Sequence, residues 1–400
     1  MLDRYSDRSC SPDETLERVA PTLEVHGITR LSRLTSLDRI GIPVWTAIRP
    51  NAKSLSVAQG KGLTDSFARA SATMEALERA VAEGPEIAAQ TASIDALEEK
   101  GCKTDPLEEF VALGQSPPTR KTSVPWIKAQ SLLEERPILV PFESACLDRT
   151  RTARYWQSSD GLASGNTEEE AVFHGLLERI ERDADTLWKL LAPKARRSTC
   201  FDPADLKDPI VDDLHRQIRK AGLHLVLFDL TSDIGVPVVS AMIGPSPGEL
   251  CSQGLNETRY IDVTEGSGAH PSASRAAIRA ITEAVQSRLT LISGARDDVP
   301  APVYQRPLPA SVALDLGSLA CRMPPEDLRG VIDGSIARHV GRLLANLRTS
   351  GVSRIYSARL NPHEDRFAVV KVLVPDLENP PGARRRRYGP RAMSRLVRFR

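Results

Sequence analysis

Long apolar runs and paired cysteines are both missing from this sequence. No apolar run reaches the length of a membrane-spanning helix, and the opening residues, MLDRYSDRSC, contain no apolar segment of the kind found in a secretion signal. The six cysteines are scattered from position 10 to position 321, and none forms a C-x-x-C pair. Their spacing therefore indicates neither a zinc site nor a disulfide framework. We expect a protein of the reducing cytoplasm that does not span a membrane.

The sequence also lacks several motifs that define common enzyme classes. No G-x-G-x-x-G follows a predicted strand, which argues against a dinucleotide-binding domain. The segment Gly60-Lys61-Gly62 does not have the spacing of a P-loop, and the sequence contains neither a G-x-S-x-G elbow nor an H-E-x-x-H motif. Covalent hydrolysis and a dinucleotide cofactor are therefore not indicated.

Positive charge is concentrated at one end of the chain. Eight of the 53 basic residues are arginines in the segment 379–400, which has no acidic residue, so the rest of the chain carries 45 basic and all 52 acidic residues, a net charge of −7. Because this body is acidic and only 4% of the residues are aromatic, we expect no nucleic-acid partner. The arginine-rich tail is either a solvated extension or a docking site for an acidic peptide or protein.

A row of polar residues lies where the first long predicted helix should bury apolar ones. Ser71, Glu75 and Glu78 are spaced i, i+4 and i+7, so they share one helical face. The stripe next to this face is apolar and consists of Ala70, Met74, Leu77 and Val81. Two carboxylates at the edge of a buried surface need cations nearby.

The same polar row recurs at an offset of 103 residues. The offset places His174 at the position of Ser71 and superimposes three pairs of residues: Glu75 and Glu178, Glu78 and Glu181, and Arg79 and Arg182. A third predicted helix, 273–292, carries a row with the same spacing, formed by Arg279, Glu283 and Gln286. A single E-x-x-E-R pattern is usually a solvated helix face, but its duplication at matched phase favours a shared site.

Such a site would suit a nucleoside triphosphate with Mg²⁺. Two acidic rows that face each other raise each other's pKa values unless a metal ion or an arginine is present. Mg²⁺ is the best candidate because it takes carboxylate oxygens together with substrate phosphates. Lys61 precedes the first polar helix, so it is a candidate phosphate contact, with a simple turn as the alternative.

The order of predicted elements favours a mixed α/β (α+β) fold over a doubly wound parallel one, because antiparallel hairpins lie between the helices. Strands are predicted at 40–45, 54–58, 224–230 and 236–243, and strand pairs at 126–129 with 138–141 and at 355–360 with 367–374. Further helices are predicted at 214–221 and 325–347, and loops at 158–167 and 266–272. Thr64 is a predicted N-cap, and the segment from Thr167 to Glu170 has the pattern of a capping box.

These motifs together resemble the YcaO superfamily of ATP-dependent peptide-modifying enzymes. The resemblance covers about 37–377 and is carried by three ordered motifs: S71-x-x-x-E75-x-x-E78-R79, then G165-N166-T167-x-E169-E170 leading to E178-x-x-E181-R182, and then R279-x-x-x-E283-x-x-Q286. It implies a two-half sandwich of pseudo-repeated sheet and helix units that holds ATP between them. The expected organisation is an N-terminal extension at 1–36, a catalytic domain at 37–378 and the tail at 379–400.

The resemblance also implies roles for individual residues. Metal ligands would be Glu75, Glu78, Glu178, Glu181 and Glu283. Nucleotide contacts would be Ser71, Arg79, Asn166, Glu170, Arg182, Arg279 and Gln286, with Lys61 added from the spacing argument above and Ser164 as a weaker candidate. No residue is assigned as catalytic in the strict sense.

The chemistry implied by the resemblance is O-phosphorylation of a peptide backbone amide by ATP with Mg²⁺. A side chain of the substrate would then give an azoline, and an external sulfide would give a thioamide. The arginine-rich end differs from the P-x-P-x-P end of many azoline-forming members, so the sequence is more similar to stand-alone members that form thioamides with a TfuA-like partner. An azoline-forming enzyme, and a nucleotide-binding accessory protein for modification of a ribosomal protein, remain the alternatives. A homodimer is plausible.

Overall fold

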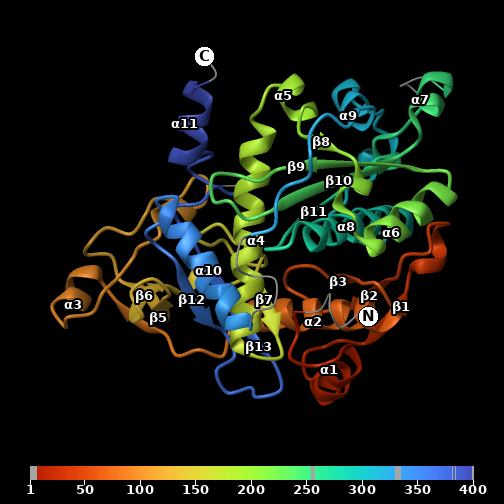
Figure 1. Cartoon of the computed structure of the whole chain (residues 1–400). Coiled ribbons are helices and arrows are strands. Elements are labelled where there is room, and N and C mark those ends of the chain that lie inside the picture. Colours follow the sequence, from red (N-terminus) through yellow and green to blue (C-terminus); the bar gives the residue numbers. More distant parts are fainter. Residues whose placement is uncertain (1–6, 254–256, 329–334, 381, 383, 399–400) are drawn as a thin grey trace.

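The fold is a mixed α/β arrangement in which antiparallel sheets pack against long helices, as the sequence predicts (Figure 1). The computed structural model describes residues 7–253, 257–328, 335–380, 382 and 384–398. No helix within these ranges combines the length and the apolar character that a membrane span requires.

The described strands form three sheets, and every pairing between them is antiparallel. The first has the order β1 (Arg30–Arg33), β2 (Val44–Ile48) and β3 (Val57–Lys61). The second has the order β11 (Thr264–Ala269), β10 (Val238–Gly244), β9 (His224–Asp229) and β8 (Cys200–Phe201). The third has the order β4 (Gln90–Ala92), β5 (Val124–Ser131), β12 (Tyr356–Arg359), β13 (Ala368–Leu373) and β7 (Leu162–Gly165), with β6 (Arg136–Pro141) also paired to β5.

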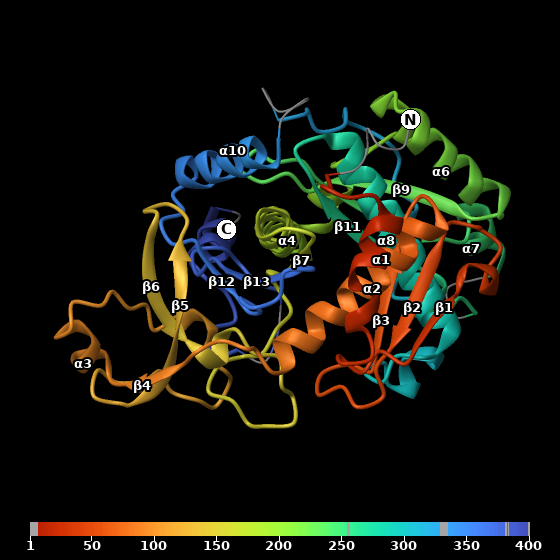
Figure 2. The ribbon, with the colours of Figure 1, turned by 90° about the horizontal axis from the view of Figure 1, so that it is seen from below.

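Three long helices organise the packing: α2 (Asp65–Glu83), α4 (Glu168–Lys189) and α8 (Ala273–Ser293). Smaller helices surround them, namely α1 (Pro12–Val19), α3 (Ile94–Glu98), α5 (Pro193–Arg197), α6 (Pro209–Lys220), α7 (Pro247–Gln253), α9 (Ala310–Leu316), α10 (Ile336–Thr349) and α11 (Pro390–Arg398). Figure 2 shows α4 end-on between the sheet that contains β12 and β13 and the unit formed by α2 and the first sheet.

Each long helix follows a strand directly and packs on the sheet of that strand. The units are β3 with α2, β7 with α4, and β11 with α8. Each helix also contacts the strand of the next unit: α2 contacts β7, α4 contacts β11 and α8 contacts β3. The three units therefore form a closed cycle, and the two halves expected from the E-x-x-E-R repeat are joined by a third unit built on α8.

Two segments predicted as loops contain strands, and this part of the prediction was wrong. The segment 158–167 contains β7, and 266–272 contains the last four residues of β11. A Cβ atom on Gly266 would lie 2.3 Å from the backbone N of Ala284, and one on Gly60 would lie 1.9 Å from that of Ala72. These glycines are needed because the helix backbone approaches the strand more closely than any side chain permits.

Several local predictions are confirmed. The hairpin of β5 with β6 and the pair of β12 with β13 form as predicted. Thr64 caps α2 by accepting a hydrogen bond from the N–H of Phe67, and Thr167 caps α4 by accepting one from the N–H of Glu170. The predicted helix 325–347 is confirmed only from 336 onward, as α10, because 325–328 are not helical and 329–334 lie outside the described residues.

The first and last described segments both contact the body. Strand β1, within the segment expected to be an N-terminal extension, pairs with β2. At the other end, α11 packs on α4, where Arg391 forms an ion pair of 2.9 Å with Asp183. The segments on both sides of each expected boundary are therefore in contact in the described chain, and the boundaries themselves stay a prediction.

Candidate active site

A cavity of about 770 Å³ lies where the three long helices meet, and their polar rows line it. The lining includes Ser71, Glu75, Glu78 and Arg79 from α2, His174, Glu178, Glu181 and Arg182 from α4, and Arg279, Glu283 and Gln286 from α8. Lys61, Ser164 and Asn166 also line it. Of the site residues predicted from the sequence, all but Glu170 line this one cavity.

The carboxylates of α2 lie in an acidic environment. Burial, followed by the charges of Glu178 and Glu75, raises the pKa of Glu78 well above its usual value. Glu75 accepts a hydrogen bond of 3.2 Å from Nε of Arg79, one helical turn away. The i, i+4 spacing seen in the sequence therefore positions a cation beside one carboxylate of this row and leaves the other short of positive charge.

The carboxylates of α4 share a single arginine. Arg182 lies 3.5 Å from Glu178, 3.7 Å from Glu181 and 3.5 Å from Asp160. Burial raises the pKa of Glu178 to about 7, although Arg182 opposes this effect, and burial also raises the pKa of Glu181. Backbone N–H groups orient both side chains, because Gly161 donates to Glu178 and Ala269 donates to Glu181.

The row of α8 has the opposite balance of charge. Lys61 donates to Oε2 of Glu283 at 2.6 Å, which joins two residues separated by more than half of the chain. Burial raises the pKa of Glu283, but the charges of Lys61 and Arg182 outweigh it, so the net shift is downward. Gln286 donates to the backbone oxygen of Gln59 at 3.4 Å, and Nε of Arg279 is buried without a hydrogen-bond partner in the described structure.

The carboxylates do not form a ready-made metal cage. Within the described ranges, which omit 1–6, 254–256, 329–334, 381, 383 and 399–400, no three acidic, histidine or cysteine side chains lie close enough together to hold a metal ion. Instead, three of the carboxylates form ion pairs with cations: Glu75 with Arg79, Glu178 with Arg182 and Glu283 with Lys61. The donor set still fits Mg²⁺, because burial leaves Glu78, Glu178 and Glu181 with raised pKa values that a hard cation would lower.

Glu170 was predicted as a nucleotide contact, but it does not line the cavity. Its side chain is fully buried and accepts hydrogen bonds from the N–H groups of Ser9 and Asn166 and from the side-chain amide of Asn166. A carboxylate that already accepts three hydrogen bonds has little capacity left to contact a nucleotide. Glu170 therefore orients Asn166, which does line the cavity.

The N-terminal segment supplies site residues that the sequence analysis missed. Asp7, Arg8 and Thr15 line the cavity, and the guanidinium of Arg8 lies 3.7 Å from Glu170. Burial lowers the pKa of Arg8. The charge of Arg279 lowers this pKa further, whereas the charge of Glu170 acts in the opposite direction. Burial and these two arginines also lower the pKa of His174 well below its usual value. Arg8 and Arg279 both line the cavity, and Nε of Arg279 has no hydrogen-bond partner in the described structure, so these arginines can offer donors to phosphate oxygens.

A buried lysine, Lys371 on β13, was also missed. Its ammonium donates to the backbone oxygens of Ser158 and Asp160, and it is only 4% exposed. This contact fixes the turn whose Gly161 N–H donates to Glu178. Burial lowers the pKa of Lys371 to about 8, although Asp160 and Glu178 oppose the shift. The sequence of β13, AVVKVL, indicates only an apolar strand, so nothing in it predicts that Lys371 would hold this turn.

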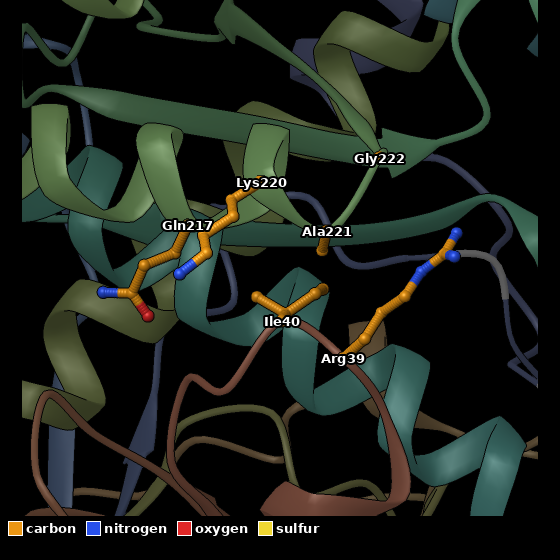
Figure 3. Close-up of a pocket in the computed structure, with 6 residues that line it drawn as sticks. All are labelled: Arg39, Ile40, Gln217, Lys220, Ala221 and Gly222. Carbon is orange, nitrogen blue, oxygen red and sulfur yellow. The ribbon is translucent and has the colours of Figure 1, made fainter.

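A second hollow, of about 510 Å³, lies on the surface between the loop at Arg39 and the end of α6 (Figure 3). Its lining consists of Arg39, Ile40, Gln217, Lys220, Ala221 and Gly222. It shares no residue with the large cavity and has no acidic side chain or histidine. We therefore place the candidate active site in the large cavity.

The chain is similar to a known family and to proteins of other organisms. The family model described as YcaO cyclodehydratase, ATP- and Mg²⁺-binding, matches residues 59–378. An uncharacterized protein of the tfuA 3′ region of Rhizobium leguminosarum bv. trifolii is 38% identical over 94% of this chain and 89% of its own length. An uncharacterized protein of Methanothermobacter thermautotrophicus is 33% identical over 92% of this chain and 94% of its own length.

Solved structures with a similar fold include two relevant proteins. The YcaO protein from Methanopyrus kandleri, bound with AMPPCP and Mg²⁺, has a TM-score of 0.71 at 23% identity and covers 94% of this chain and 93% of its own. A heterocyclase in complex with substrate and cofactor has a TM-score of 0.74 at 22% identity over 93% of this chain, which spans 53% of that protein. By its match over most of its length and by its identity to these relatives, the chain belongs to the YcaO family of ATP- and Mg²⁺-binding cyclodehydratases.

Proposed function

We propose that this protein activates a peptide backbone amide by ATP- and Mg²⁺-dependent O-phosphorylation. The observation that carries the proposal is the meeting of three polar rows, from helices far apart in the sequence, in one cavity. This cavity contains buried carboxylates with raised pKa values and an arginine, Arg279, whose Nε has no hydrogen-bond partner in the described structure. A triphosphate with its metal ion would satisfy both groups at once.

Under this proposal the residues divide into two sets. Glu75, Glu78, Glu178, Glu181 and Glu283 would hold Mg²⁺, which when bound neutralises phosphate charge and aligns the transferred phosphoryl group. The phosphate oxygens would be bound by Lys61, Arg8, Arg182 and Arg279, with Ser71, Asn166 and Gln286 as neutral contacts and Arg79 orienting Glu75. Preorganised cations of this kind stabilise charge that develops during transfer.

The reaction makes a poor leaving group into a good one. The amide oxygen attacks the γ-phosphorus of ATP, an O–P bond forms, and the bond to the ADP oxygen breaks. A nucleophile then adds to the activated carbon and the oxygen leaves as phosphate. The role of the protein is to hold the amide and the γ-phosphate together and to exclude water.

For the nucleophile, the proposal is an external sulfide, which gives a thioamide, with a TfuA-like protein as partner. The relative from a tfuA 3′ region supports this choice. The family description as cyclodehydratase supports the alternative, in which a Cys, Ser or Thr side chain of the substrate closes an azoline ring. The two outcomes differ in mass, because the first exchanges oxygen for sulfur and the second loses water.

The test is peptide-dependent ATP consumption by wild type and by Glu178→Gln. Because this substitution keeps the size of the side chain but removes a carboxylate from the cavity, we expect activity to fall about a hundredfold or more. Glu169→Gln is the matched control, since Glu169 is exposed on the same helix. Mass spectrometry of a peptide co-expressed with the TfuA-like protein then identifies the product. A wild-type protein that binds ATP but does not consume it with any peptide and partner would point to the accessory role instead.

A further inference from the structure

The segment 7–15, here called the N-terminal strap, forms part of the cavity wall. Residues of the strap that line the cavity are Asp7, Arg8, Cys10, Pro12 and Thr15. The strap comes before the first sheet in the sequence, so no strand of its own fixes it there. Its end at 12–15 belongs to α1, which packs on α2, whereas 7–11 is held by contacts with the units built on α4 and α8.

One set of contacts joins the strap to the unit of β7 and α4. Arg8 donates to the backbone oxygen of Ser164 at 3.1 Å, and the N–H of Ser9 donates to Glu170. Thr15 donates from its hydroxyl to Oδ1 of Asn166 at 3.0 Å. These contacts hold the strap from one side of the cavity.

The second attachment is a single side chain, Asp7, which reaches the unit of β11 and α8. One carboxylate oxygen accepts a hydrogen bond from Nε2 of His270 at 2.9 Å, and the other pairs with the guanidinium of Arg275. The N–H of Ser272 donates to Nδ1 of His270 at 2.8 Å, so Nδ1 is the acceptor nitrogen and the proton lies on Nε2. This arrangement fixes the ring with Nε2 directed at Asp7.

The Asp7 carboxylate is well suited to this contact. Its side chain is 15% exposed and that of His270 is 3% exposed, so water competes little for the hydrogen bonds. Burial raises the pKa of Asp7, but the hydrogen bond from His270 and the charge of Arg275 outweigh it and lower the pKa overall. A carboxylate that accepts from two such donors forms stronger hydrogen bonds than a neutral acceptor would.

We propose that Asp7 is a positioning residue that fixes the N-terminal strap between the α4 and α8 units and thereby holds Arg8 in the nucleotide cavity. This inference rests on the proposed function for the identity of the occupant. Asp7 acts through the strap, because its carboxylate points to His270 and Arg275. Without Asp7 the strap keeps its contacts with Glu170 and Asn166 but loses its attachment to α8, so Arg8 must be reordered each time nucleotide binds.

The experiment compares Asp7→Ala with Glu17→Ala, which removes a carboxylate from the exposed face of α1 close to the strap. The readouts are the Kd of Mg·ATP by calorimetry, hydrogen exchange of the amides in 9–15, and kcat at saturating ATP. For Asp7→Ala we expect a Kd about tenfold higher, faster hydrogen exchange in 9–15 and a kcat within about twofold of wild type. The free energy needed to reorder Arg8 reduces the affinity for ATP but does not affect the step after ATP is bound. Glu17→Ala should match wild type in all three.

A charge exchange separates positioning from a general packing defect. Asp7→Arg and Arg275→Asp each place like charges together, whereas the double variant restores an opposite pair, so it should recover most of the affinity lost in either single variant. The inference is overturned if Asp7→Ala leaves both the Kd and the exchange unchanged, or if the double variant binds ATP no better than the singles. A wild type that binds no ATP would instead refute the proposed function, while the exchange data would still report whether Asp7 orders the strap.

Discussion

Glu83 shows how a single buried carboxylate holds the end of a helix that lines the cavity. It ends α2, is 6% exposed and receives both guanidinium nitrogens of Arg49, at 3.2 and 2.8 Å. The N–H and hydroxyl of Ser54 also donate to it, at 3.0 and 2.6 Å. This network ties the end of the helix that carries Glu75 and Glu78 to the loop before β3.

We expect Glu83→Gln to lower the free energy of unfolding at pH 7 by about 3–5 kcal/mol, because the substitution leaves the charge of Arg49 buried without a counter-charge. Urea unfolding would measure the change. Glu99→Gln is the control, since Glu99 is exposed. Equal stability of the two variants would contradict the role assigned to the Arg49 pair.

The effect of Glu83 should depend on pH in a defined direction. Burial raises the pKa of Glu83, but the hydrogen bonds from Arg49 and Ser54 outweigh it, so the folded pKa lies below the usual 4.5. The contribution of the carboxylate is therefore fully present above pH 4.5 and is lost as the pH falls through the folded pKa. The difference in midpoint temperature between wild type and Glu83→Gln should shrink over that acidic range.

Helical spacing predicts which residues of one helix share a face, and this is why Glu75, Glu78, Glu178, Glu181, Arg279 and Glu283 could be assigned to a site from the sequence. Contacts between distant segments leave no such pattern. Asp7 and Arg8 reach the cavity because the chain folds back across it, and Lys371 interrupts an apolar strand without any periodic signal. The position of Glu170 outside the cavity lining could not be predicted for the same reason, because its partner Ser9 is 161 residues away.

At the scale of elements, the packing of α8 on β11 depends on glycines in the strand. Substitution of Gly266 by alanine would place a Cβ atom 2.3 Å from the backbone N of Ala284 and 2.4 Å from the backbone O of Ala280. Backbone atoms cannot rotate away, so the helix itself must move. Because α8 carries Arg279 and Glu283, such a movement would also disturb the cavity.

We expect Gly266→Ala to lower the free energy of unfolding by about 3 kcal/mol or more, since overpacking against a fixed backbone costs at least as much as core overpacking does. Gly341→Ala is the control, because Gly341 lies in α10 with no heavy atom within 4 Å of the added Cβ. That substitution should be neutral or stabilise by about 0.5–1 kcal/mol, as in other helix interiors. Similar effects of the two substitutions in urea unfolding would refute the close-packing argument.

The same close packing explains why the strands β7 and β11 could not be predicted. Their sequences, LASG and TEGSGA, contain the small and polar residues that usually mark loops. Only the presence of a helix on the strand, which is a tertiary fact, makes these residues necessary. The strands that pack through large side chains, such as β5, β6 and β13, were identified from their apolar pattern.

At the scale of the whole molecule, the arginine-rich tail is anchored through its charged face. Arg391 pairs with Asp183 at 2.9 Å and with Asp233 at 2.5 Å, and Glu378 accepts hydrogen bonds from the N–H groups of Gly389 and Ala392. Met393, Leu396 and Val397, spaced i, i+3 and i+4, are exposed on the outside of α11. The helix therefore presents its apolar stripe to solvent. The exposed Arg385, Arg386 and Arg387 lie in the segment that precedes the helix.

This arrangement makes the tail a candidate docking site for the acidic partner considered above, and the anchor decides how it should be tested. Truncation would remove Arg391 and leave Asp183 buried without its cation, which destabilises the body for a reason unrelated to docking. Reversal of Arg385, Arg386 and Arg387 to glutamate spares the anchor. We expect this triple variant to bind a synthetic oligoglutamate peptide, or the proposed TfuA-like partner, about ten- to a hundredfold more weakly at low salt.

The difference should shrink as the salt concentration rises, because exposed charges are screened over about 10 Å at 0.1 M ionic strength. The matched control reverses Lys100, Lys194 and Arg342, three exposed cations elsewhere on the surface, and changes the net charge by the same amount. If docking is local to the tail, titration calorimetry will show weaker binding for the arginine variant and little change for the control. Equal weakening of both would mean that net charge alone attracts the partner, and unchanged binding of both would remove the tail from the interface.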